Sequence, residues 1–136
     1  MISVVMATYN GEKYINQQLE SIFNQNVCAN IELYIRDDGS TDRTIDIIRK
    51  WKEQFNITLF IKNNVGPAQS FWELFSMKDI KADFYAFADQ DDLWDSNKLQ
   101  IGINSLKNEK IEALWCSNCR IIDQNGKVLN DEMNKN

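Results

Sequence analysis

The sequence predicts an α/β fold in which a mostly parallel sheet is flanked by helices and the chain ends in a β-hairpin. Short apolar runs typical of strands alternate with segments whose apolar residues recur every three to four positions, as on an amphipathic helix. Repeated alternation with short connections is typical of parallel strands covered on both faces. After residue 106 the alternation stops, and Asn125-Gly126 between two short apolar segments indicates a hairpin.

The first two strand and helix pairs are expected within residues 2–55. Residues 2–7 and 31–35 are apolar runs of the kind found in strands. Each run is followed by apolar residues at helical spacing, which predicts two amphipathic helices. The residues that set this spacing are Tyr14, Ile15, Leu19, Ile22 and Phe23 in the first helix, and Ile45, Ile48, Trp51 and Phe55 in the second.

The remaining elements follow the same reasoning. Strands are expected at residues 57–61 and 84–88, helices at 68–77 and 96–106, and hairpin strands within 113–123 and 127–129. Residues 130–136 carry no pattern and are expected to form a frayed end or the stump of a truncation. No linker or internal repeat interrupts the chain, so we expect one domain over residues 1–136.

The composition argues against several classes of protein. The net charge of −5 and the pI near 4.7 disfavour a nucleic-acid-binding protein, which needs a basic face. No apolar stretch approaches the roughly 20 residues of a membrane span, and residues 1–6 have the pattern of a strand rather than of a signal peptide. Cys28, Cys116 and Cys119 cannot form a complete set of disulfides, which favours a cytoplasmic protein.

The Cys116-Ser117-Asn118-Cys119 segment is a CxxC motif without the residues that would make it a metal site. A zinc ion needs four ligands, and the chain offers one further cysteine and no histidine. A redox CxxC opens a helix, whereas Ala113 to Cys116 has the pattern of a strand. We therefore interpret both cysteines as small strand residues.

Three carboxylates follow the predicted strand at residues 84–88. They are Asp89, Asp91 and Asp92. Carboxylates this close together repel one another unless a cation lies among them. Mg²⁺ and Mn²⁺ suit such ligands, because they bind one or two carboxylates together with the oxygens of a substrate diphosphate. Taken alone, the cluster is explained equally well by a solvated acidic turn.

Polar residues follow the other three strands as well, at the edge of the sheet where ligands bind in open α/β folds. An acid of Asp37-Asp38 could accept the ring N–H of uracil or thymine, whereas residues 40–42 are typical of a turn and a helix cap. Thr8-Tyr9-Asn10 could hold a base or simply end a strand. No Gly-rich phosphate loop is present, which disfavours dinucleotide enzymes and P-loop NTPases and leaves a metal ion to neutralise a diphosphate.

Four motifs in this order and spacing together resemble the family 2 glycosyltransferases of the GT-A fold, over nearly the whole chain. The combination DQDD-x-W followed by a lysine looks most like bacterial capsule and O-antigen transferases, including the rhamnosyltransferase-like group. The motifs are Thr8-Tyr9-Asn10, Asp37-Asp38-Gly39-Ser40-Thr41-Asp42, Asn64-Val65-Gly66 with Phe71, and Asp89-Gln90-Asp91-Asp92-Leu93-Trp94 with Lys98.

The resemblance implies that this chain binds a nucleotide sugar, either a UDP-sugar or a dTDP-sugar. By that analogy Asp38 contacts the base, with Asp37 in support. Thr8, Tyr9 and Asn10 line the nucleoside pocket.

The resemblance also implies how the acidic cluster works. Asp89 lies near the ribose and the metal, and Asp91 ligates the Mg²⁺ or Mn²⁺ ion that bridges the diphosphate. Asp92 is either an outer-shell ligand or a residue that faces the donor sugar, and Lys98 is a surface or structural residue. The ion would stabilise the departing diphosphate while an acceptor hydroxyl attacks the anomeric carbon with inversion.

Members of this family continue beyond such a hairpin with an acceptor-binding half that carries the general base. No residue of this chain matches that base, so none is assigned, and we expect the chain to bind donor and metal without turning over alone.

The implied acceptor is a polysaccharide or lipid-linked saccharide, and the implied location is the cytoplasm, including the inner face of the membrane for the full-length protein. A non-catalytic nucleotide-sugar-binding module is the alternative. A response-regulator-like domain fits the hairpin and the acidic cluster poorly.

Overall fold

The computed structural model describes residues 1–130. These residues divide into two compact units, the first Met1–Gln100 and the second beginning at Ile101. Helix α4 (Lys98–Leu106) crosses the boundary. The single domain expected from the sequence stays a prediction. The expected frayed end lies outside the described residues except for Asn130, which belongs to the last strand.

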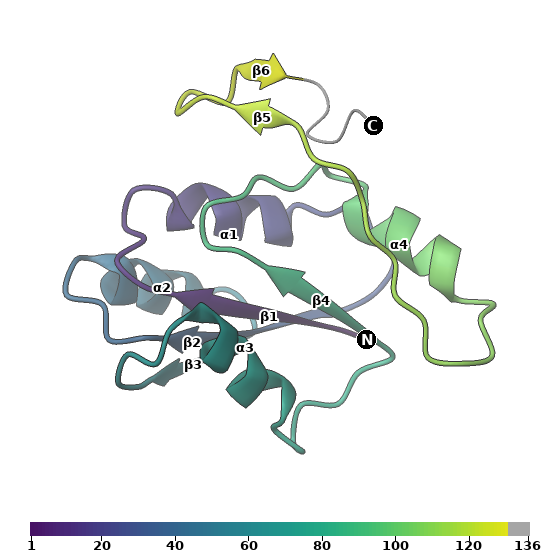
Figure 1. Cartoon of the computed structure of the whole chain (residues 1–136), viewed down its shortest axis with the longest axis horizontal. Coiled ribbons are helices and arrows are strands. Elements are labelled where there is room, and N and C mark those ends of the chain that lie inside the picture. The colour runs from purple at the N-terminus through teal and green to yellow at the C-terminus, as the bar shows by residue number, and fades with distance from the viewer. Residues whose placement is uncertain (131–136) are drawn as a thin grey trace. The chain divides into compact units, whose positions relative to one another are not determined.

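A sheet of four parallel strands forms the centre of the first unit (Figure 1). The strand order is β3-β2-β1-β4, so β1 is a central strand, and its residues Ile2 to Met6 are buried on both faces. Burial on both faces explains why β1 is an almost continuous apolar run. The strands are β1 (Ile2–Thr8), β2 (Ile31–Asp37), β3 (Ile57–Ile61) and β4 (Phe84–Ala88).

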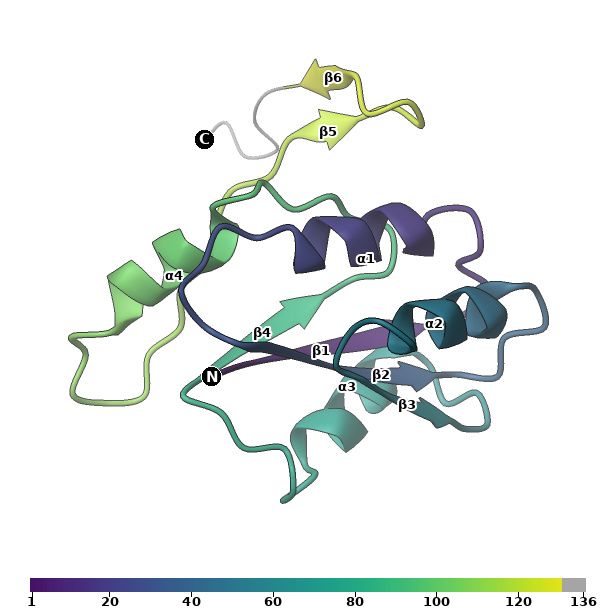
Figure 2. The same cartoon turned by 180° about the vertical axis from the view of Figure 1, so that it is seen from behind.

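Three helices cover the two faces of this sheet (Figures 1 and 2). Helices α1 (Ile15–Phe23) and α2 (Thr44–Lys52) lie side by side on one face, and α3 (Pro67–Phe75) lies on the other. The handedness of parallel crossovers requires this arrangement. The connections from β1 to β2 and from β2 to β3 step in one direction across the sheet, whereas the connection from β3 to β4 steps back.

Aromatic side chains join the helices to one another and to the sheet. Phe23 of α1 stacks on Phe55, which follows α2, with ring centroids 4.3 Å apart. On the opposite face, Phe75 of α3 meets Tyr85 and Phe87 of β4, each at 5.9 Å. Leu74 of α3 is fully buried in the core of that face. The first contact joins α1 to the segment after α2, and the contacts of Phe75 join α3 to the sheet.

Strand β2 extends two residues beyond the segment expected from the sequence. Arg36 and Asp37 are polar and have the character of a loop, yet both belong to β2 and are 2% and 0% exposed. Burial of a guanidinium and a carboxylate requires partners, and both have them. The sequence pattern alone does not reveal those partners.

The second unit contains the predicted hairpin, formed by β5 (Ile121–Ile122) and β6 (Val128–Asn130). Gly126 has φ +79 in the turn, and the Asp123 carboxylate accepts the N–H groups of Asn125 and Lys127. The hairpin signal is therefore confirmed.

The predicted strand over residues 113–123 is wrong for most of its length, because only Ile121 and Ile122 are strand. Within the described part of the second unit, no strand pairs with residues 113–120, and the Leu114 side chain is 81% exposed. β-propensity expresses packing against neighbours, so an apolar run without them does not become a strand. Cys116 and Cys119 are therefore not strand residues, and both are exposed. Cys28 in the first unit is exposed as well.

None of the helices within residues 1–130 is both long enough and apolar enough to cross a membrane.

Candidate functional site

Four polar loops follow the four parallel strands at the same edge of the sheet. We call residues 9–14 the β1 loop, residues 38–43 the β2 loop, residues 62–66 the β3 loop and residues 89–97 the acidic loop. All of the candidate site residues lie in these loops or at the strand ends that precede them. The expected convergence of the four motifs at one edge is confirmed.

The β1 and β2 loops are joined by reciprocal hydrogen bonds between backbone and side chains. The N–H of Asn10 donates to Ser40 Oγ at 2.9 Å, and the N–H of Thr41 donates to Asn10 Oδ1 at 2.8 Å. Two residues after Asn10, the N–H of Glu12 donates to Asp42 Oδ2 at 3.0 Å. Asn10 has φ 48, a left-handed conformation that asparagine tolerates better than most residues. In this structure its side chain binds the neighbouring loop, and its contact with a nucleoside stays a prediction.

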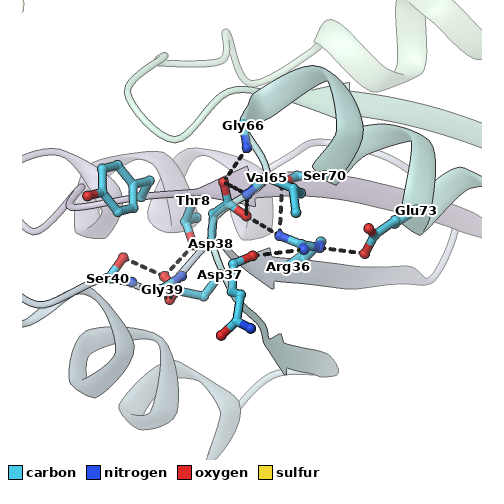
Figure 3. A network of polar contacts seen from close by, with 12 residues as sticks. Thr8, Arg36, Asp37, Asp38, Gly39, Ser40, Val65, Gly66, Ser70 and Glu73 are labelled. Carbon is cyan, nitrogen blue, oxygen red and sulfur yellow. Dashed lines mark hydrogen bonds and ion pairs between the residues drawn. The ribbon is translucent and has the colours of Figure 1, made fainter.

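Asp37 supports the start of the β2 loop (Figure 3). Its carboxylate accepts the N–H of Ser40 at 2.8 Å, the Ser40 hydroxyl at 2.6 Å and the Thr8 hydroxyl at 2.9 Å. Thr8 is itself 2% exposed. Thr8 and Asp37 therefore lie together, and both are engaged within the protein rather than facing solvent.

Asp38 points to the opposite side of β2, as successive residues of an extended chain do (Figure 3). Its carboxylate pairs with the Arg36 guanidinium and accepts the N–H groups of Val65 at 3.0 Å and Gly66 at 2.8 Å. Gly66 has φ +85, a conformation that favours glycine. Asp38 thus ties the β2 loop to the β3 loop.

The charge of Asp38 is stabilised by these contacts. Burial alone would raise the pKa of the carboxyl, but the hydrogen bonds from Val65, Arg36 and Gly66 outweigh burial and hold the pKa below its usual value. Arg36 is in turn held by Glu73 at 2.9 Å and by Ser70 at 2.9 Å, both on α3. The result is a buried ionic network that fixes the base-contact candidate in one position.

Tyr9 lies at the outer end of β1, and its side chain is 48% exposed. Its backbone is held by Gln90 of the acidic loop. The N–H of Tyr9 donates to Gln90 Oε1 at 2.9 Å, and Gln90 Nε2 donates to the Tyr9 carbonyl at 3.1 Å. The role of Gln90 could not be predicted from the sequence, because a glutamine among three aspartates does not indicate that it will bind the backbone of a residue 81 positions away.

The three carboxylates of the acidic loop face solvent. Asp89, Asp91 and Asp92 are exposed. Partial burial raises the pKa of Asp92, and the charges of Asp89 and Asp91 raise it further, while Lys98 opposes them. The charged form of Asp92 is thus disfavoured by its two acidic neighbours, as expected for a carboxylate beside like charges.

The backbone of the acidic loop is nevertheless anchored. The Trp94 side chain is buried, and the backbone N–H of Trp94 donates to Ser21 Oγ at 3.1 Å. The ammonium group of Lys98 lies 5.3 Å from the centre of the Trp94 ring, within cation–π range. The buried indole and this backbone bond hold the loop to the body of the first unit, while the three acids stay exposed.

The acidic loop offers some, but not all, of the ligands that a hard divalent cation needs. Within residues 1–130, no three acidic, cysteine or histidine side chains are gathered so as to hold a metal ion by themselves. Carboxylate oxygens are nonetheless the donors that Mg²⁺ and Mn²⁺ prefer, and these ions commonly use one or two of them with phosphate oxygens and water. The loop therefore fits an ion that arrives with, or is completed by, a diphosphate.

Comparison with known proteins identifies the family. The family model described as glycosyl transferase family 2 matches residues 3–132. The chain belongs to glycosyl transferase family 2. Its sheet and flanking helices have the GT-A fold, as the sequence motifs implied.

Similar proteins act in bacterial glycosyl transfer, according to their names. The dTDP-rhamnosyl transferase RfbG of Shigella flexneri is 36% identical over 106 residues, which are 74% of this chain and 36% of that protein. A UDP-Glc:alpha-D-GlcNAc-diphosphoundecaprenol beta-1,3-glucosyltransferase, WfaP of Escherichia coli, is 36% identical over 111 residues, 82% of this chain and 43% of that protein.

A solved structure of S. aureus TarS, residues 1–349 in complex with UDP, superposes with a TM-score of 0.66 at 30% identity. The match covers 76% of this chain and 32% of that one. This chain thus spans less than half the length of RfbG, WfaP and the TarS fragment.

Proposed function

We propose that this chain is the donor-binding part of a metal-dependent, inverting glycosyltransferase that takes a sugar from a UDP-sugar or dTDP-sugar. The acceptor in this proposal is a polysaccharide or lipid-linked saccharide, and the full-length protein works in the cytoplasm or at the inner face of the membrane. Family membership and the names of RfbG, WfaP and TarS support the donor class.

One observation carries the proposal at the level of chemistry. The four loops at this edge of the sheet, which we call the rim, carry two sets of aspartates. Only the set in the acidic loop is exposed, and there the charges of Asp89 and Asp91 raise the pKa of Asp92. A bound divalent cation would remove that repulsion and supply Lewis-acid stabilisation of the leaving diphosphate. We assign Asp91 and Asp89 as its ligands, and Asp92 as an outer-shell or sugar-facing residue.

The nucleoside part of the donor is assigned to the other side of the rim. The exposed ring of Tyr9 offers an apolar face to the base. In this assignment Asp38 accepts a ring N–H of uracil or thymine in exchange for one of its present contacts, because its two oxygens already make four hydrogen bonds with Arg36, Val65 and Gly66. Asp37, Thr8 and Asn10 hold the loops that carry these groups.

Titration calorimetry with UDP, with and without Mn²⁺, tests the metal assignment. We expect Mn²⁺ to strengthen UDP binding to the wild-type chain and Asp91→Asn to remove that gain. Loss of a metal's outer-shell partners already costs about 10- to 100-fold in metal affinity, so loss of a ligand should cost at least as much. Asp79→Asn is the matched control, because Asp79 is exposed and precedes β4 at the opposite end of that strand. Unchanged Mn²⁺-dependent affinity in Asp91→Asn would contradict the assignment.

A separate assay addresses turnover. No general base is assigned, and the chain spans 36% of RfbG and 43% of WfaP, so we expect no transfer to an added acceptor by the 136-residue chain alone. Robust transfer by the purified chain would refute this expectation. Donor binding without transfer, in this chain and in any longer protein that contains it, would instead favour a non-catalytic binding module.

A further inference from the structure

The side-chain amide of Gln90 continues the pairing of β1 with β4 beyond the point where the two backbones separate. Backbone register between these strands runs from Ile2 opposite Phe84 to Met6 opposite Ala88. Further along, Gln90 binds both polar backbone groups of Tyr9, accepting from the N–H at 2.9 Å and donating to the carbonyl at 3.1 Å. One amide thereby satisfies a donor and an acceptor that strand pairing no longer serves.

Gly11 provides a second, independent observation. A Cβ atom at this position would lie 2.3 Å from Gln90 Oε1 and 2.7 Å from Gln90 Cδ, far inside van der Waals contact. The φ of Gly11 lies outside the left-handed range that favours glycine. The backbone conformation therefore does not require glycine at position 11. The space that the Gln90 amide occupies does require it.

Gln90 stands between Asp89 and Asp91, so a bond that fixes its side chain also restrains the backbone of both. Its partner Tyr9 is the exposed aromatic residue at the nucleoside side of the rim. Hydrogen bonds that hold a binding constellation in place before the ligand arrives reduce the entropy lost on binding. The same restraint would keep the metal-binding and base-binding groups at one spacing.

We propose that Gln90 is a positioning residue: its amide, admitted by Gly11, locks the acidic loop to Tyr9 so that one nucleoside diphosphate engages both sides of the rim. The inference rests on the proposed function. It adds to that function a coupling element that contacts neither the metal nor the nucleotide.

Two variants remove the contact between Gln90 and Tyr9, one by changing Gln90 itself and the other by changing Gly11. Gln90→Met keeps the length of the side chain and removes both hydrogen bonds. Gly11→Ala leaves the acidic loop intact but displaces the flexible end of Gln90. The backbone contacts of Gly11 with Thr44 Oγ1 and with the N–H of Ile15 need no change. Gln17→Met, on an exposed position of α1, is the matched control.

Amide hydrogen exchange of Tyr9 and UDP titration with and without Mn²⁺ are the measurements. In both variants we expect faster exchange at Tyr9 and a Mn²⁺-dependent UDP affinity that is lower by about tenfold, the smaller end of the effect of metal outer-shell residues. UDP affinity without Mn²⁺ and the melting temperature should remain at the wild-type level. The double variant should bind like either single variant, because each removes the same contact.

Three outcomes would overturn the inference or its basis. Faster exchange at Tyr9 with unchanged Mn²⁺-dependent affinity would mean that the contact exists but positions nothing. An equal fall in both UDP affinities together with the melting temperature would indicate a general structural role. A wild-type chain without Mn²⁺-dependent UDP binding would overturn the proposed function itself, a result obtained before any variant is made.

Discussion

Aspartates occur at two places on the same rim, and the protein treats them in opposite ways. Asp37 and Asp38, at the end of β2, are 0% and 4% exposed and are surrounded by hydroxyl, N–H and guanidinium donors. Asp91 and Asp92, in the acidic loop, are exposed. Nearby donors lower the pKa of Asp38, whereas partial burial and neighbouring acids raise the pKa of Asp92.

The difference separates acids that hold the fold together from acids that the fold leaves exposed. The buried acids at β2 use their charge to hold the β2 loop, the β3 loop and the end of β1 in place, so their removal should unfold or loosen the protein. The acids of the acidic loop gain little from the fold, so their removal should affect ligands and leave stability nearly unchanged. The predictions below test this division, beginning with the largest effect.

Asp38→Ala should destabilise the protein by about 3–5 kcal/mol, because it leaves Arg36 buried with an incomplete set of partners. Urea unfolding followed by circular dichroism measures the loss. Asp91→Ala is the comparison and should stay within about 0.5 kcal/mol of wild type, as exposed substitutions usually do. Similar losses in the two variants would contradict the division.

Asp37→Ala should cost about 1–3 kcal/mol, the usual penalty for leaving buried polar groups without a hydrogen-bond partner. The groups concerned are the N–H of Ser40 and the hydroxyl of Thr8. The effect should be smaller than for Asp38→Ala, because no buried cation is left behind. The same urea unfolding experiment ranks the two variants, and the reverse order would show that the Arg36 network contributes less than its burial suggests.

Acid should weaken the β2 side of the rim. The folded-state pKa of Asp38 and that of Asp42 are both lowered, by hydrogen bonds that outweigh burial. Each therefore contributes stability above the unfolded-state pKa of about 3.9, and that contribution is lost as the pH falls through the lower folded-state value. The unfolding free energy is measured at neutral pH and below about pH 4, which gives the slope of stability against pH. In Asp38→Asn the slope should be shallower than in wild type.

Asp92→Asn should have the smallest effect and the opposite sign. Partial burial and the charges of Asp89 and Asp91 disfavour its ionised form, so a neutral amide should stabilise the metal-free chain slightly. Because the side chain is exposed, the gain should stay below about 0.5 kcal/mol. Thermal unfolding in the presence of a chelator measures it. A clear loss of stability would show that Asp92 is held by the fold after all.

Sequence reasoning was most successful where one local pattern decides the structure. Strands 57–61 and 84–88 are found with the expected bounds, since each is a short apolar run between polar residues. The hairpin follows from Asn125-Gly126, because a turn that needs a positive φ is a local requirement. The strand predicted for residues 113–120 was wrong for the converse reason. Whether an apolar run becomes a strand depends on a neighbouring strand, and the run itself does not show whether that neighbour exists.

The same limit applies to the site. The loops could be located from the sequence, because parallel strands bring their carboxyl ends to one edge. The contacts within the rim could not, since Arg36 with Glu73 and Tyr9 with Gln90 meet across 37 and 81 positions of chain. The sequence therefore predicted which acids gather at the rim, and only side-chain packing separates those that hold the fold from those that face solvent.

The anchoring of the acidic loop by Trp94 has an optical consequence. Among the tryptophans of residues 1–130, Trp94 alone is buried, two positions after Asp92. A shielded indole emits at shorter wavelength than a hydrated one, so release of this loop from the body of the protein should move part of the emission to the red. Paramagnetic Mn²⁺ in the loop should also dim this fluorophore more than Mg²⁺ does. The protein thus carries a built-in spectroscopic reporter beside its candidate metal site.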